Sequence, residues 1–66
     1  MMVMVNGRPW ELPEGSSVAD VIERFGAPGS GVAVALDGAV VPRALWPSAL
    51  LHEGALVEVL TAVQGG

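Results

Sequence analysis

A chain of 66 residues is long enough for one small domain, and the absence of cysteine excludes disulfides as a source of its stability. The net charge is −4, with three arginines and no lysine, which argues against nucleic acid as a partner. The chain is 52% hydrophobic, yet it contains no apolar run long enough to span a membrane and no secretory signal, so we expect a cytoplasmic protein.

The first segment predicts a β-hairpin. Residues 2–5 are apolar, as expected of a buried strand, and Asn6-Gly7 is the strongest two-residue signal for a hairpin turn. Residues 8–12 then form the return strand. Because Pro9 cannot donate a hydrogen bond to a neighbouring strand, we expect this strand to lie or begin at a sheet edge.

One amphipathic helix is predicted between Ser17 and Gly26. Its apolar residues recur at helical spacing, and they are Val18, Val21, Ile22 and Phe25. Ser17 and Asp20 have the spacing of a capping box, with Asp as a shorter substitute for the usual Glu or Gln. Gly26 suits the position just after the helix, and Pro28 prevents the helix from resuming.

The second half of the chain predicts three more strands. Residues 32–36 and 39–41 flank Asp37-Gly38, a second hairpin turn, and residues 43–47 form one helical turn bounded by prolines. Residues 56–63 form the last strand, which runs directly into the terminal glycines.

This order of elements predicts an α+β protein of the β-grasp type. One helix must cover one sheet, since each has one apolar face to bury. We expect a mixed sheet of four to five strands, with the first and last strands side by side in its centre and one main helix packed on one face. Residues 1–63 make up this domain, and residues 64–66 form a flexible Gly-Gly tail.

No set of residues in the sequence predicts catalysis, a metal site or a bound cofactor. His52 has no cysteine partners for a metal, and the carboxylates are scattered over caps, turns and exposed faces.

The group that points to a function is the carboxylate of Gly66, which follows two consecutive glycines. Because glycine has no Cβ, Gly65 and Gly66 can pass through a slot too narrow for any side chain, which predicts delivery of this carboxylate into another protein's active site. The alternative is an ordinary frayed terminus.

Alternation along the strands predicts an apolar outer face on the sheet, opposite the helix. Glu58 is best left in water, so its side of the last strand is assigned to the outside. The small and flexible side chains of this face suit contacts with partner proteins, and they are Met2, Met4, Ala33, Ala35, Leu60 and Ala62. The alternatives are that these residues merely fill a twisted sheet, or that the assignment of faces is inverted.

The whole chain resembles the sulfur carrier proteins of thiamin (thiazole) biosynthesis, which are relatives of ubiquitin by fold. The resemblance is carried by Val5-Asn6-Gly7, by Val41-Pro42-Arg43 followed by Trp46, by the Gly54 turn and by Gly65-Gly66. One departure is Ala55, where the family commonly has aspartate.

We expect Trp46 to close one end of the core and Arg43 to pair with an acidic neighbour. The alternative is that both contact a partner.

The resemblance implies a carrier rather than an enzyme. A ubiquitin-activating-like adenylyltransferase, using ATP and Mg²⁺, would convert the Gly66 carboxylate to an acyl-adenylate. Sulfur from a donor such as a cysteine desulfurase would then give a thiocarboxylate, which thiazole synthase would consume. Three alternatives stay open: the small subunit of molybdopterin synthase, a ubiquitin-like protein modifier, and an interaction module whose terminal glycines have no function.

Overall fold

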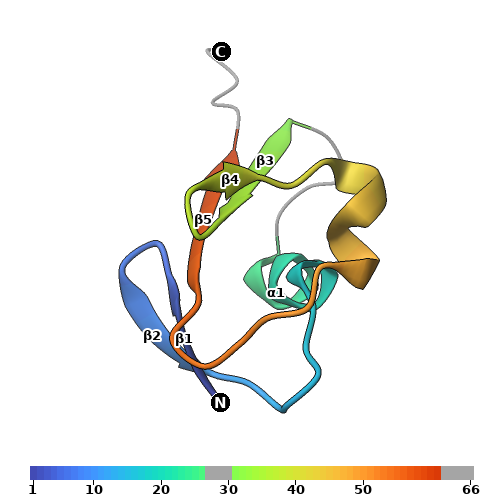
Figure 1. The fold of residues 1–66 in the computed structure, drawn as a ribbon. Helices are drawn as coiled ribbons and strands as arrows, with labels where there is room; N and C mark the ends of the chain where they lie inside the picture. The colour runs from blue at the N-terminus through green and yellow to red at the C-terminus, as the bar shows by residue number, and fades with distance from the viewer. Residues whose placement is uncertain (27–30, 62–66) are drawn as a thin grey trace.

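The computed structural model describes residues 1–26 and 31–61, which form one sheet, one α-helix and one 3₁₀ helix (Figure 1). The elements in chain order are β1 (Met2–Val5), β2 (Arg8–Glu11), α1 (Val18–Phe25), β3 (Val32–Leu36), β4 (Ala39–Val40), η1 (Arg43–Ser48) and β5 (Leu56–Thr61).

The five strands lie in the order β2-β1-β5-β3-β4. β1 and β5 run parallel, while each of the other neighbouring pairs is antiparallel, so the sheet is mixed. Figure 1 shows β5 running between β1 and β3, with α1 and η1 to one side of the sheet. The predicted β-grasp arrangement is therefore confirmed, and β2, which contains Pro9, lies at an edge as expected.

Both predicted hairpin turns have left-handed backbone. Asn6 and Gly7 have φ of 52° and 79°, and Asp37 and Gly38 have φ of 50° and 87°. Two consecutive positive φ angles match the right-handed twist of the flanking strands, and Asn, Asp and Gly tolerate them best. The turn residues thereby fix the pairing of β1 with β2 and of β3 with β4.

The helix α1 begins with the predicted capping box. The Ser17 amide donates to Asp20 Oδ2 at 2.8 Å, and the Asp20 amide donates to Ser17 Oγ at 3.3 Å. Gly26 ends the helix with φ of 79°. The apolar face differs from the prediction at Phe25, which is 38% exposed because it stacks on Trp10 of β2 at the sheet edge rather than entering the core.

The core lies between the sheet and α1 and is closed at one end by η1. Val3, Val5, Val18, Val21, Val34 and Val57 have fully buried side chains. Trp46 of η1 is buried as predicted, and its Nε1 donates to the Val41 carbonyl at 2.9 Å. The ion pair expected for Arg43 is not found among the described residues: its guanidinium lies over the Trp46 ring, 5.2 Å from the centroid.

In the part of the chain that the structure describes, no helix is long and apolar enough to cross a membrane.

Candidate functional site: the outer sheet face and the end of β5

The central strand β5 leads toward the terminal glycines. Its last described residue is Thr61, which pairs with Val32 of β3. The predicted continuation of the strand to residue 63 and the tail at 64–66 lie outside the described residues. The same is true of Ala62, Gly65 and Gly66.

β5 is held on both sides close to this end. On one side, β3 pairs with it continuously from Leu36–Val57 to Val32–Thr61. On the other side, the ladder of β1 stops at Val5–Val57, but the side chain of Asn6 extends it. Asn6 Oδ1 accepts from the Val59 amide at 2.8 Å, and Asn6 Nδ2 donates to the Val59 carbonyl at 3.1 Å.

The alternation predicted for β5 is confirmed. Val57 and Val59 are buried toward the helix, with 1% and 4% of their surfaces exposed, whereas Glu58 is exposed and Leu60 is 68% exposed. Cross-strand pairing carries the same assignment into β3, because Ala33 faces Leu60 and Ala35 faces Glu58. An inverted assignment of the two faces is therefore excluded.

Five of the six residues predicted for partner docking are described, and all five share the outer parity. Met2 and Ala33 are exposed, and Met4 and Ala35 are half-buried, alongside the exposed Leu60. The register brings them together, since Met4 lies opposite Leu56 on β5 while Ala33 lies opposite Leu60. We call this surface the outer sheet face.

The outer sheet face also contains two large residues that the sequence prediction missed. Leu56 is 56% exposed and has the same parity as Glu58 and Leu60. Val40 is 76% exposed and lies opposite Ala35. Parity along the last strand was enough to find Leu56. Val40 required the register of the β3–β4 hairpin.

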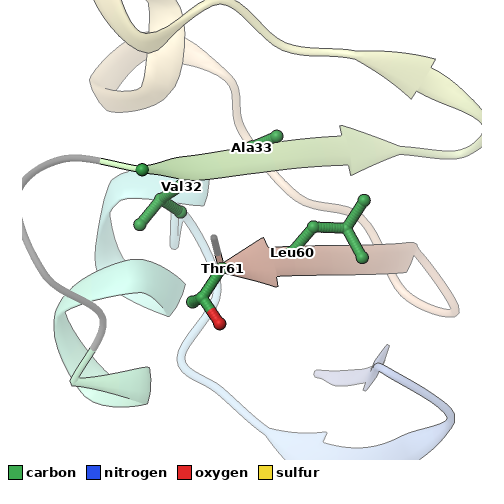
Figure 2. A pocket seen from close by; sticks show the side chains of 5 residues that line it. Val32, Ala33, Leu60 and Thr61 are labelled. Carbon is green, nitrogen blue, oxygen red and sulfur yellow. The ribbon is translucent and has the colours of Figure 1, made fainter. Parts of the chain in front are cut away.

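Two shallow hollows open beside β5. One, of about 390 Å³, lies at the last described residues of the strand and is lined by Gly31, Val32, Ala33, Leu60 and Thr61. Figure 2 shows Ala33 and Leu60 on one side of the two strands, with Val32 and Thr61 on the other. The second, of about 340 Å³, lies between the two hairpin turns and is lined by Met4, Gly7, Gly38, Leu56, Val57 and Glu58.

A polar cluster joins the start of β5 to the β3–β4 turn. Asp37 Oδ1 accepts from the Leu56 amide at 2.9 Å, and Asp37 Oδ2 lies 2.6 Å from His52 Nε2. The amide of Leu56, followed by His52, lowers the pKa of Asp37, and the Asp37 carboxylate raises the pKa of His52. The sequence does not predict this cluster, because β4 and η1 separate Asp37 from His52 along the chain.

Within residues 1–26 and 31–61, no three acidic or histidine side chains gather in a way that could hold a metal ion. What the described residues do form is a largely apolar outer sheet face along β5, the strand that precedes Gly65 and Gly66 in the sequence.

Comparison with known proteins adds to this geometry. The model of the ThiS family matches residues 3–66. The chain is 38% identical over 65 residues to the sulfur carrier protein ThiS of Thermus thermophilus, a match that covers 98% of this chain and 100% of that protein.

Two solved structures of a thiamine biosynthesis protein (ThiS) from Geobacter metallireducens have the same fold. The crystal structure matches with a TM-score of 0.81 at 28% identity, covering 100% of both chains. The solution structure matches with a TM-score of 0.82 at 28% identity, covering 100% of this chain and 88% of the other.

Proposed function

Because the chain belongs to the ThiS family, we propose that it carries sulfur for thiamin biosynthesis as a co-substrate of other enzymes rather than as a catalyst. One observation carries this proposal: the family match extends to residue 66 and so includes Gly65 and Gly66. The described residues support it, since exposed leucines lie on β5, the strand that precedes Gly65 and Gly66 in the sequence.

The proposed chemistry takes place at the Gly66 carboxylate. A carboxylate oxygen attacks the α-phosphorus of ATP in an adenylyltransferase that supplies Mg²⁺, and pyrophosphate leaves. The terminal sulfur of a donor persulfide then attacks the carbonyl carbon of the acyl-adenylate, and AMP leaves as the carbon–sulfur bond forms. A thiol cleaves the remaining sulfur–sulfur bond, so that one sulfur stays on Gly66 and the donor leaves as a disulfide. The resulting thiocarboxylate is the sulfur donor for thiazole synthase. Gly65 contributes access, because a residue without Cβ allows the end of the chain into a narrow channel.

The outer sheet face is the proposed docking surface for the adenylyltransferase. Its exposed leucines, Leu56 and Leu60, lie on the strand that leads to Gly66, so docking there brings the carboxylate to the partner. Met2, Met4, Ala33 and Ala35 surround them with flexible or small side chains that adapt to an opposing surface. Ala62 continues the same alternation by sequence.

The remaining partners follow from the same chemistry. The sulfur comes from a donor such as a cysteine desulfurase, and thiazole synthase consumes it. We place these reactions in the cytoplasm, where ATP is available and where a chain without cysteine needs no oxidising environment.

Mass spectrometry tests the proposal. The purified chain is incubated with the adenylyltransferase of the same organism, ATP, Mg²⁺, a cysteine desulfurase, cysteine and a thiol reductant. We expect the intact mass to rise by the difference between one sulfur and one oxygen atom, and fragmentation to place that change on Gly66. A variant lacking Gly66 is the matched control and should gain no sulfur. An unmodified Gly66 in the presence of a demonstrably active partner would refute the proposal, as would sulfur attached to another residue.

A further inference from the structure

Glu58 is an isolated charge in the middle of the apolar outer sheet face. Along β5 it lies between Leu56 and Leu60, which are 56% and 68% exposed. Across the sheet it faces Ala35, and Val40 lies beyond Ala35 on the next strand. Any protein that covers the two leucines must therefore also cover this carboxylate.

No cation in the described part of the chain forms an ion pair with Glu58. The N-terminal amine lies beside Glu14, and His52 lies beside Asp37. Arg24 lies over the Trp10 ring and donates to the Glu11 carbonyl, while Arg43 lies over Trp46. Arg8 faces Val5 and so belongs to the helix side of the sheet. Of the strand residues with outer parity, the charged ones are Glu11 at the β2 edge and Glu58 in the centre, and both are acidic.

Glu58 lines the second of the two hollows beside β5. This hollow lies between the turns that contain Gly7 and Gly38, and Met4 and Leu56 are also among the residues that line it. Neither glycine carries a side chain that would fill the space. A side chain with a long apolar stem and a cationic end fits this combination, because its stem can lie on Met4 and Leu56 while its charge meets the carboxylate.

When a partner covers the outer sheet face, the Glu58 carboxylate is removed from water either with a cation beside it or without one. A carboxylate taken out of water without a partner costs far more than an apolar contact of the same size contributes. We therefore propose that the adenylyltransferase inserts an arginine or lysine side chain into the hollow between the two hairpin turns and pairs it with Glu58. This inference rests on the proposed function, since it assumes that the outer sheet face docks on that enzyme.

The dissociation constant of the complex tests this pairing. Glu58→Gln keeps the size and polarity of the side chain but removes its charge, so the partner's cation is left buried and unpaired. We expect the complex to weaken at least about tenfold, which corresponds to about 1.4 kcal/mol. Glu23→Gln, on the exposed face of α1, makes the same change in net charge away from the outer sheet face and should leave the affinity unchanged.

The salt dependence provides a second measurement on the same variants. Raising the ionic strength from about 50 mM to about 300 mM should weaken the native complex and the Glu23→Gln complex by the same factor. The Glu58→Gln complex should weaken by a smaller factor. The melting temperature of both variants should match that of the native chain, because both carboxylates are exposed in the free protein.

A Glu58→Gln complex that is as tight as the native one, or tighter, would contradict the pairing. If the partner offers only apolar surface to Glu58, then Glu58→Gln relieves a desolvation cost and binds as tightly as the native chain or more tightly, which overturns the pairing. Leu60→Glu separates this failure from failure of the docking surface itself. Loss of binding in Leu60→Glu together with unchanged binding in Glu58→Gln rejects only the pairing. Unchanged binding in Leu60→Glu rejects the docking surface and the pairing with it.

Discussion

At the scale of single residues, the contacts of His52 favour its protonated form. Its Nε2 lies 2.6 Å from the Asp37 carboxylate, and its Nδ1 lies 2.9 Å from the Glu53 carbonyl. Both of these neighbours are hydrogen-bond acceptors, so both ring nitrogens must carry protons to satisfy them. The geometry therefore favours the imidazolium, in agreement with a pKa of His52 raised chiefly by its hydrogen bond to Asp37.

The pair should make stability depend on pH in a defined direction. The raised pKa of His52 means that its contribution is complete below its ordinary 6.5 and is lost as the pH rises through the raised value. The lowered pKa of Asp37 means that its contribution is complete above its ordinary 3.8 and is lost as the pH falls through the lowered value. The pair therefore contributes most between these two ordinary values and progressively less above pH 6.5.

Asp37→Asn isolates this effect. Asparagine tolerates the positive φ at this position and keeps an acceptor for the Leu56 amide, but it removes the charge that faces His52. NMR titration should show the pKa of His52 falling toward 6.5 in the variant. The difference in unfolding free energy between native and variant chains should shrink as the pH rises above 6.5. An identical pKa of His52 in both proteins would contradict this account.

At the scale of elements, the residue that follows β1 continues the hydrogen bonding of β1 to β5. The chain leaves β1 at Asn6, whose backbone amide still donates to the Val57 carbonyl. The Asn6 side chain then supplies a donor and an acceptor to Val59, as the next residue of a continuing strand would do. β5 is thereby paired on both sides up to Val59, although the backbone of β1 has already turned away.

Asn6→Gly tests this role of the side chain. Glycine keeps the positive φ and removes the side chain together with both of its hydrogen bonds, so we expect a loss of about 1–3 kcal/mol in unfolding free energy. Urea unfolding measures the loss, and hydrogen exchange of the Val59 amide should accelerate more than that of Val57. Asn6→Asp keeps the acceptor and loses the donor, so it should protect the Val59 amide better than glycine does. Native-like stability and exchange in Asn6→Gly would rule out the proposed support of β5.

The sequence predicts the elements whose determinants are local. The two hairpin turns, the capping box of α1 and the alternation along β5 each depend on residues within a few positions of one another, and the structure confirms them. The differences at Phe25 and Arg43 arise because stacking on Trp10 and Trp46 depends on how segments meet in space. The Asn6–Val59 contact spans most of the chain, and no local pattern indicates it.

At the scale of the whole molecule, the two faces of the sheet differ in burial. One face is closed by α1 and η1 over a core rich in valine. The other face leaves Leu56, Leu60 and Val40 largely exposed, which accounts for a mean hydropathy of +0.55 in so small a domain. β5 belongs to both, since its alternate residues fill the core and form the centre of the outer sheet face. We therefore expect substitutions at adjacent positions of β5 to change stability and partner binding separately.

Deletion of the gene tests the pathway in which the whole molecule acts. Because the chain belongs to the ThiS family, the deletion strain should require the thiazole moiety of thiamin and should retain its molybdoenzyme activity. A plasmid carrying the native chain should remove the thiazole requirement, whereas the variant lacking Gly66 should not, even when it accumulates to the same level. Equal accumulation matters because it separates loss of the carrier group from loss of the fold. Growth of the deletion strain without thiazole, together with loss of molybdoenzyme activity, would instead assign the chain to the synthesis of molybdopterin.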